Sequence, residues 1–229
     1  MIPRDNQQYA KREYWDERFA SEESYEWLVS FDGVKGQLTP LLREQDDILV
    51  VGCGNSSFSA DLFDAGYRHV TSIDYSSRVI ERMTARYPQL KWLCADMTKL
   101  EDSFPAGSFD VVIDKAAMDA LVCEEGDPWN PNESVVQSCD AMCRGVRHVL
   151  KPSSAGDPPS PSRFIQISFA QPHFRRRYLL GTHGRPREAD KPNEEGLHVS
   201  EKYQWTLRHQ DIVSESGAFN NFLYVCCCM

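Results

Sequence analysis

The chain has 229 residues, of which 41% are hydrophobic and 26% are charged, and its formal net charge is −9 at pH 7. This length fits one α/β domain, and the acidic balance disfavours a nucleic-acid-binding protein, which usually carries a basic face. No apolar run approaches the roughly 18 residues that span a bilayer, and the first residues lack an apolar signal core. We therefore expect one cytoplasmic domain over residues 1–229, without nucleic-acid or membrane partners.

Residues 1–45 form an N-terminal arm rich in aromatic side chains. The pattern of residues 9–31 is helical at first and loop-like afterwards, and the rings are Tyr14, Trp15, Phe19, Tyr25 and Trp27. One interpretation is an arm that packs these rings on the core. The other is a lid over a flat ligand, since aromatic side chains line many small-molecule sites.

From residue 48 onward, strand and helix patterns alternate. Residues 48–51, ILVV, form a continuous apolar run that is typical of a strand covered on both faces. Further strands are expected at residues 69–74, 91–96, 109–115, 163–169, 203–209 and 221–228, and helices at residues 56–66, 76–88 and 133–151. Strands that alternate with helices predict βαβ units and a parallel sheet with helices on both faces.

Three segments do not fit this alternation. Residues 152–162 and 181–203 are poor in apolar side chains, so we expect mobile loops there. Residues 173–178, HFRRRY, are interpreted as a solvated basic turn, with a docking patch for an acidic protein surface as the alternative.

The first predicted strand ends at two glycines, Gly52 and Gly54. Glycine has no Cβ to block a ligand and permits unusual backbone angles, and the helix that follows offers free N–H groups. A dinucleotide-binding loop would have a third glycine where Ser57 stands. Two glycines alone are weak evidence for a ligand site.

Charged residues at the ends of the next three strands strengthen this evidence. Asp74 could accept hydrogen bonds from both ribose hydroxyls, and Asp96 or a neighbouring backbone N–H could contact an adenine edge. Lys115 could pair with a ligand carboxylate, with a surface lysine as the alternative. Because no Arg or Lys flanks the glycine loop, the pattern favours S-adenosylmethionine over NAD.

The series GCGN, DYS, CADM and FDVVIDKAAMDAL resembles the class I S-adenosylmethionine-dependent methyltransferases. That resemblance implies a Rossmann-like, doubly wound seven-strand sheet, mostly parallel with an antiparallel C-terminal strand. The segments YWDERF, DPW and ISFAQPHFR resemble more narrowly the methyltransferase-like group that modifies lysines of translation elongation factor 1-alpha. This implies a protein-lysine N-methyltransferase with S-adenosylmethionine as cofactor, S-adenosylhomocysteine as product and the elongation factor as its protein substrate.

The resemblance also implies which residues contact the cofactor. They are Trp15, Phe19, Trp27, Gly52, Asp74, Tyr75, Asp96, Met97 and Lys115. Phe19 stands where relatives tend to have tyrosine, so only stacking could remain there. Val50 stands where many members of the broad class have an acid, which suggests that other groups hold the methionine end, with Trp15 and Lys115 as candidates. Ser56 replaces the third glycine of the broad class.

No residue is assigned a catalytic role. Asp114 and Asp119 are candidate general bases, although capping or solvated roles are favoured for both. Trp15, Phe19 and Trp129 could wall a channel for the acceptor lysine by cation–π contact. A small-molecule methyltransferase and a cofactor-binding partner subunit without catalysis remain alternative functions.

The eight cysteines are expected to be reduced thiols. No CxxC pair is present, and the spacing of Cys139 and Cys143 is one helical turn, so no metal site is predicted. The terminal CCCM is interpreted as the end of a strand, with metal binding as a much less favoured alternative.

Overall fold

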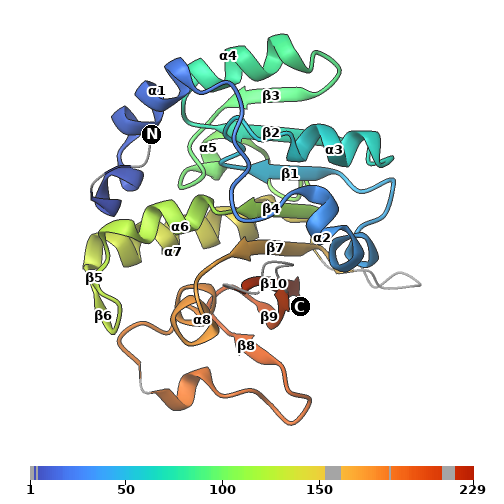
Figure 1. Cartoon of the computed structure of the whole chain (residues 1–229). Helices are drawn as coiled ribbons and strands as arrows, with labels where there is room; N and C mark the ends of the chain where they lie inside the picture. The colour runs from blue at the N-terminus through green and yellow to red at the C-terminus, as the bar shows by residue number, and fades with distance from the viewer. Residues whose placement is uncertain (1–2, 4, 153–160, 186, 213–219) are drawn as a thin grey trace.

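The computed structural model describes residues 3, 5–152, 161–185, 187–212 and 220–229. Their central element is an eight-stranded sheet of order β3-β2-β1-β4-β7-β10-β9-β8 (Figure 1). In chain order these strands are β1 Ile48–Val51, β2 Val70–Asp74, β3 Lys91–Cys94, β4 Val111–Lys115, β7 Arg163–Ser168, β8 His198–Ser200, β9 Trp205–Ile212 and β10 Asn221–Cys228.

The first five strands in this order are parallel to one another, and β10 is antiparallel to both of its neighbours, β7 and β9. The predicted fold class, a mostly parallel doubly wound sheet with an antiparallel C-terminal strand, is confirmed. The predicted count of seven strands is wrong by one. The additional strand is β8, which pairs with β9 at the edge of the sheet.

Helices cover both faces of the sheet. The helices are α1 Arg12–Ser21, α2 Phe31–Leu38, α3 Phe58–Asp64, α4 Ser77–Arg86, α5 Leu100–Ser103, α6 Ala117–Leu121, α7 Glu133–Val149 and α8 Pro172–Leu180. Side chains of α2, α3 and α4 share one hydrophobic core with Ile48 and Val50 of β1, while α5, α7 and α8 share the other with Leu49 and Val51. This alternation along β1 follows from the opposite directions of successive side chains in a strand.

The longest helix, α7, contacts the sheet as its apolar spacing predicted. All of its expected inward residues are buried, and they are Val135, Cys139, Met142, Val146 and Val149, with Leu150 buried just beyond the helix end. The expectation for the C-terminus is also confirmed, since Cys226 and Cys228 are buried in β10.

Two expectations for the connecting segments are wrong. Residues 173–178 lie in α8 rather than in a solvated turn, and Arg175 is only 1% exposed because it forms a buried ion pair with Asp119. Residues 181–203, expected as a mobile loop, contain the short 3₁₀ helix Arg187–Asp190 and β8. Most of the other expected loop, residues 153–160, lies outside the described residues.

Smaller elements complete the structure. The arm begins with the 3₁₀ helix Asn6–Ala10, a second one spans Thr39–Leu41, and a third, Val122–Glu124, follows α6. The hairpin β5 Gly126–Asp127 and β6 Asn130–Pro131 projects from the chain between α6 and α7 (Figure 1). Within the described residues, no helix has the length and apolar character that crossing a membrane requires.

Candidate cofactor site

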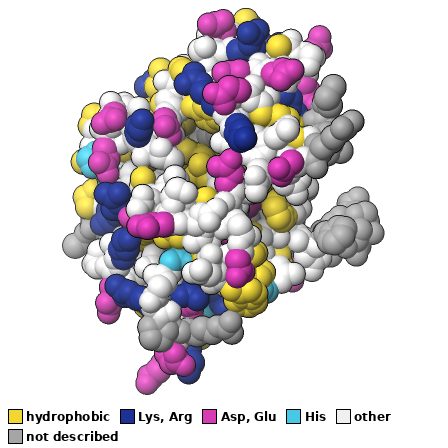
Figure 2. All heavy atoms as spheres, turned by 90° about the vertical axis from the view of Figure 1, so that its left-hand side faces the viewer, with side chains coloured by type: hydrophobic (Ala, Val, Ile, Leu, Met, Phe, Trp, Pro, Cys, Tyr) yellow, Lys and Arg dark blue, Asp and Glu magenta, His cyan; other side chains and the backbone are white. Residues whose placement is uncertain are grey.

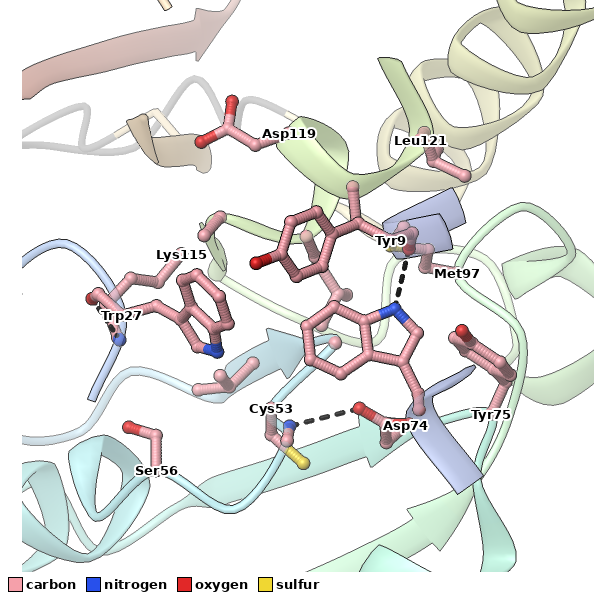
Figure 3. Close-up of a pocket in the computed structure, with 18 of the residues that line it drawn as sticks. Tyr9, Trp27, Cys53, Ser56, Asp74, Tyr75, Met97, Lys115, Asp119 and Leu121 are labelled. Carbon is pink, nitrogen blue, oxygen red and sulfur yellow. Dashed lines mark hydrogen bonds between the residues drawn. The ribbon is translucent and has the colours of Figure 1, made fainter. Parts of the chain in front are cut away.

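A cavity of about 710 Å³ lies at the carboxyl ends of β1, β2 and β4, between these strand ends and the N-terminal arm. All nine residues that the sequence predicted as cofactor contacts line it: Trp15, Phe19, Trp27, Gly52, Asp74, Tyr75, Asp96, Met97 and Lys115. In Figure 3, Asp74, Tyr75 and Met97 lie toward one end of the cavity, and Trp27 and Lys115 lie toward the other. Trp15 and Lys115, which are a hundred positions apart in the sequence, therefore line the same cavity.

The glycine loop is shaped mainly by the protein's own packing. Gly52 has φ +59°, and a Cβ on it would lie 2.4 Å from the Cβ of Ala117. Gly54 has φ +52°, but a Cβ there would meet Phe19 at an ordinary 3.6 Å. Both angles are costly for residues other than glycine, and Gly52 is additionally required by its contact with α6. The structure thus explains Gly52 without any reference to a ligand.

Asp74 is held at the end of β2 by two backbone donors. Its Oδ2 accepts from the Gly54 N–H and its Oδ1 from the Ser76 N–H, each at 3.0 Å. Burial raises the pKa of this carboxyl to about 6. Each carboxylate oxygen has a second lone pair, so Asp74 can accept further hydrogen bonds from a ligand.

Asp96 organises the turn between β3 and α5. Its Oδ1 accepts from the Thr98 N–H at 2.9 Å and from the Thr98 hydroxyl at 2.7 Å. Its side chain is 43% exposed. These hydrogen bonds fix the backbone of the turn beside Met97. Asp96 and Met97 both lie in the cavity wall.

Lys115 is buried, with an exposure of 8%, so the alternative of a surface lysine is wrong. Its ammonium forms an ion pair with Glu26 and donates to the Trp27 carbonyl oxygen at 2.9 Å. Ser56 of the glycine loop donates to the same Glu26 carboxylate at 2.8 Å. Burial lowers the pKa of Lys115, and the Glu26 carboxylate opposes that effect. One arm carboxylate thereby connects β4, the glycine loop and the arm.

The aromatic side chains of the arm contact one another as well as the cavity. Trp15 donates from Nε1 to the Tyr9 carbonyl oxygen at 2.6 Å, and its ring lies 5.6 Å from Phe19 and 5.9 Å from Trp27 between centroids. Phe19 is 3% exposed and belongs to a hydrophobic core. The packing interpretation is thus confirmed for Phe19, and the lid interpretation stays a prediction for Trp15 and Trp27.

The two candidate general bases, Asp114 and Asp119, both accept hydrogen bonds from other residues of the protein. Asp114 accepts from the Ala117 N–H and from Gln166 Nε2, each at 2.7 Å, so its expected capping role is confirmed. Asp119 lines the cavity but accepts from Ser168 Oγ and from Arg175, and its carboxylate turns away from the middle of the cavity (Figure 3). Burial raises the pKa of both carboxyls.

Trp129 does not wall this cavity, so that expectation is wrong. The β5–β6 hairpin holds it against α8, where its ring contacts His173 and Phe174. Two lining residues that the sequence did not indicate are Tyr9 and Phe169. Phe169 ends the predicted fifth strand and directly follows β7, and the rule that ligands bind at the carboxyl ends of parallel strands could have indicated it.

The cavity fits S-adenosylmethionine in size and chemistry. Its volume of about 710 Å³ is within the usual range for small-molecule sites. A buried carboxylate at one end suits ribose hydroxyls, a buried ammonium at the other suits a carboxylate, and aromatic rings lie between. No cluster of cations is needed, because this ligand has no phosphate.

Comparisons with known proteins agree with this fit. Residues 48–128 match the family described as "Methyltransferase domain". The chain is 36% identical to mouse "EEF1A lysine methyltransferase 4" over 98% of its own length and 78% of the relative's. It is 33% identical to human "eEF1A lysine and N-terminal methyltransferase" over 76% of this chain and 24% of that protein.

A solved structure supports the fold. The N-methyltransferase NodS from Bradyrhizobium japonicum, in complex with S-adenosylhomocysteine, superposes with a TM-score of 0.54. The superposition covers 97% of this chain and 98% of NodS, at 16% sequence identity.

Proposed function

Because the chain belongs to the EEF1A lysine methyltransferase 4 family, we propose that it methylates a lysine of translation elongation factor 1-alpha. It is an S-adenosylmethionine-dependent methyltransferase. The observation that carries the proposal is that all nine predicted cofactor contacts line one cavity, in a chain similar to these lysine methyltransferases over nearly its whole length.

The proposed cofactor contacts follow the two ends of the cavity. Asp74 accepts hydrogen bonds from the ribose hydroxyls, and Tyr75, Asp96 and Met97 surround the adenine. Lys115, held by Glu26, lies at the end that receives the amino-acid part of the cofactor. The arm closes this end through Trp27, whose carbonyl oxygen binds Lys115.

S-adenosylmethionine supplies a methyl group that is already activated on a sulfonium. The residues of this chain therefore position the reactants and exclude water rather than activate a bond. An acceptor lysine has a pKa of about 10.4 in water and must lose its proton before it attacks. A cavity walled by Trp15, Phe19 and Trp27 favours the neutral amine by desolvation.

The direct test is methylation of the purified elongation factor. The protein is incubated with recombinant elongation factor 1-alpha and cofactor labelled in its methyl group, and the product is digested and analysed by mass spectrometry. We expect the label on a lysine side chain of the factor. Label found only on small molecules would overturn this proposal, and cofactor binding without any transfer would indicate a non-catalytic partner subunit.

We place this activity in the cytoplasm, where the proposed substrate serves translation. Fractionation of cells that express the tagged protein should recover it with cytosolic markers. Exclusive recovery in another compartment would contradict this placement.

A further inference from the structure

A second hollow of about 440 Å³ lies outside the cofactor cavity. It is formed by α8, the β5–β6 hairpin and the segment from residue 190 to 198, and we call it the α8 groove. Helical spacing places His173, Arg176 and Arg177 toward this groove, while Arg175 points inward to Asp119. The basic run that the sequence singled out is therefore divided between the interior and this surface.

The groove keeps a net positive charge after its internal contacts are considered. Arg177 lies 3.7 Å from Asp190 and donates to two backbone carbonyls, so this acid and this base compensate each other. His198 Nδ1 binds the Asp190 carbonyl oxygen, which leaves Nε2 to accept from Arg176 at 3.0 Å. Burial and Arg176 lower the pKa of His198. Arg176 and the exposed Lys191 remain as uncompensated cations among the described lining residues.

Arg176 has capacity for a ligand. Only its Nη1 has a hydrogen bond in the described part of the chain, to His198, and its buried Nε has no partner there. Nη2 has no hydrogen bond among the described residues, so it can donate a charge-assisted hydrogen bond to an incoming carboxylate.

An aromatic wall lies beside these cations. Trp129 is 57% exposed, and its ring stacks on His173 at 5.8 Å between centroids with an interplanar angle of 21°. Tryptophan at the edge of a polar groove is typical of protein-binding surfaces, where it anchors an apolar side chain of the partner.

The groove adjoins the opening of the cofactor cavity. Phe169 lines that cavity and is 57% exposed, so it marks where the cavity meets solvent. His173 follows four positions later, a separation of at most about 14 Å even for a fully extended chain. Figure 2 shows a hollow lined by hydrophobic side chains in the upper half of this face, with Lys and Arg side chains and a histidine gathered below it.

We propose that the α8 groove docks an acidic segment of the protein substrate while the adjacent lysine enters the cofactor cavity. A carboxylate of that segment binds Arg176 and Lys191, and a neighbouring apolar side chain packs on Trp129. The proposal rests on the proposed function, and it adds the chemistry by which the substrate is recognised. It requires an acidic side chain near the methylated lysine in the substrate.

Charge reversal tests this docking. Lys191→Glu and Arg176→Glu are compared with Arg68→Glu, an exposed arginine in the turn between α3 and β2, at the opposite end of the strands. We expect each groove variant to raise KM for recombinant elongation factor 1-alpha about tenfold, with kcat within about twofold of wild type. Affinity for S-adenosylhomocysteine, measured by calorimetry, should be unchanged in all three, and added salt should raise the wild-type KM.

The outcomes separate this proposal from the one on which it rests. A wild-type protein that leaves the elongation factor unmethylated overturns the proposed function and the docking together. A wild type that is active, with KM unchanged in the Lys191 variant, overturns the docking alone. Because Lys191 is exposed, its variant decides the question even if Arg176→Glu fails to fold. Recovery of KM when the acidic side chain of the substrate is changed to lysine confirms the contact.

Discussion

Two ion pairs flank the cofactor cavity, and they differ in their burial and in the segments that they join. On the arm side, Lys115 lines the cavity and pairs with Glu26, whose side chain is 27% exposed. On the α8 side, Asp119 pairs with Arg175, and both side chains are almost completely buried. The first pair joins a peripheral arm to the ligand site, whereas the second joins α6 to α8 within the core. The difference indicates that one pair serves binding and the other serves the fold.

The largest expected effect is on the α8 side. Asp119→Ala leaves the Arg175 guanidinium buried without its counter-charge, and its Nε and Nη1 already have no partner among the described residues. We expect the free energy of unfolding to fall by about 3–5 kcal/mol, as for other broken buried pairs. Urea unfolding measures this loss.

Asp47→Ala provides the control for that variant. Asp47 pairs with Lys151 at 2.8 Å, but its side chain is 45% exposed. Removing an exposed pair of this kind costs about 1 kcal/mol or less. Equal losses in the two variants would show that Asp119 and Arg175 do not form the structural pair described above.

Substitutions in the glycine loop, which connects the two sides of the cavity, should have the next largest effect on stability. Gly52→Ala should destabilise the protein by about 2–4 kcal/mol, because a left-handed backbone angle and a clash with Ala117 add together. Gly54→Ala, whose Cβ meets only an ordinary contact with Phe19, should cost about 1–2 kcal/mol. Thermal unfolding of both variants checks the order, and a smaller loss at Gly52 than at Gly54 would contradict the packing contact.

The ribose role of Asp74 predicts a pH dependence of cofactor binding. Its pKa in the folded chain is about 6, above the ordinary 3.8, so between these values the folded state holds a proton that the unfolded state has lost. Stability therefore decreases as the pH rises across this window and is constant above about 6. The ionised carboxylate accepts the hydroxyls, so affinity should increase as the pH rises toward 6.

Calorimetry with S-adenosylhomocysteine measures this dependence. One pH unit below the pKa of Asp74 the affinity should be about tenfold weaker than at neutral pH. Asp74→Asn should bind about 1.5–3 kcal/mol more weakly at neutral pH and lose the pH dependence. Asp114, whose pKa is also raised to about 6, does not line the cavity, so its titration gives no such profile. Unchanged affinity in Asp74→Asn would remove this residue from the ribose role.

The smallest stability change is expected on the arm side. Glu26→Gln removes the counter-charge of Lys115 but leaves an amide that can still contact Ser56. Because Glu26 is partly exposed, water can replace some of the lost interaction, and we expect a loss of about 1 kcal/mol of stability. Cofactor affinity should change by more than stability does. A loss of stability as large as that of Asp119→Ala would show that both ion pairs serve the fold, which would contradict the difference between them.

The strand ends were predictable because their chemistry is local in the sequence. Asp74, Asp96 and Lys115 each end or follow a recognisable apolar strand, and parallel strands bring such ends to one edge of the sheet. Their partners were not predictable in this way. Glu26 lies 89 positions from Lys115, and Asp119 lies 56 positions from Arg175, so only packing brings these charges together.

The sequence by itself determined the order of most strands and of the main helices, the fold class, and nine of the residues that line the cofactor cavity. These depend on apolar periodicity and on side chains next to strand ends, which are properties of short segments. Only the tertiary structure decided that Lys115 is buried against Glu26, that Gly52 is required by Ala117, and that the arginines after β7 face both the interior and a groove. Burial of a charge depends on which distant segments cover it, and no local pattern records that.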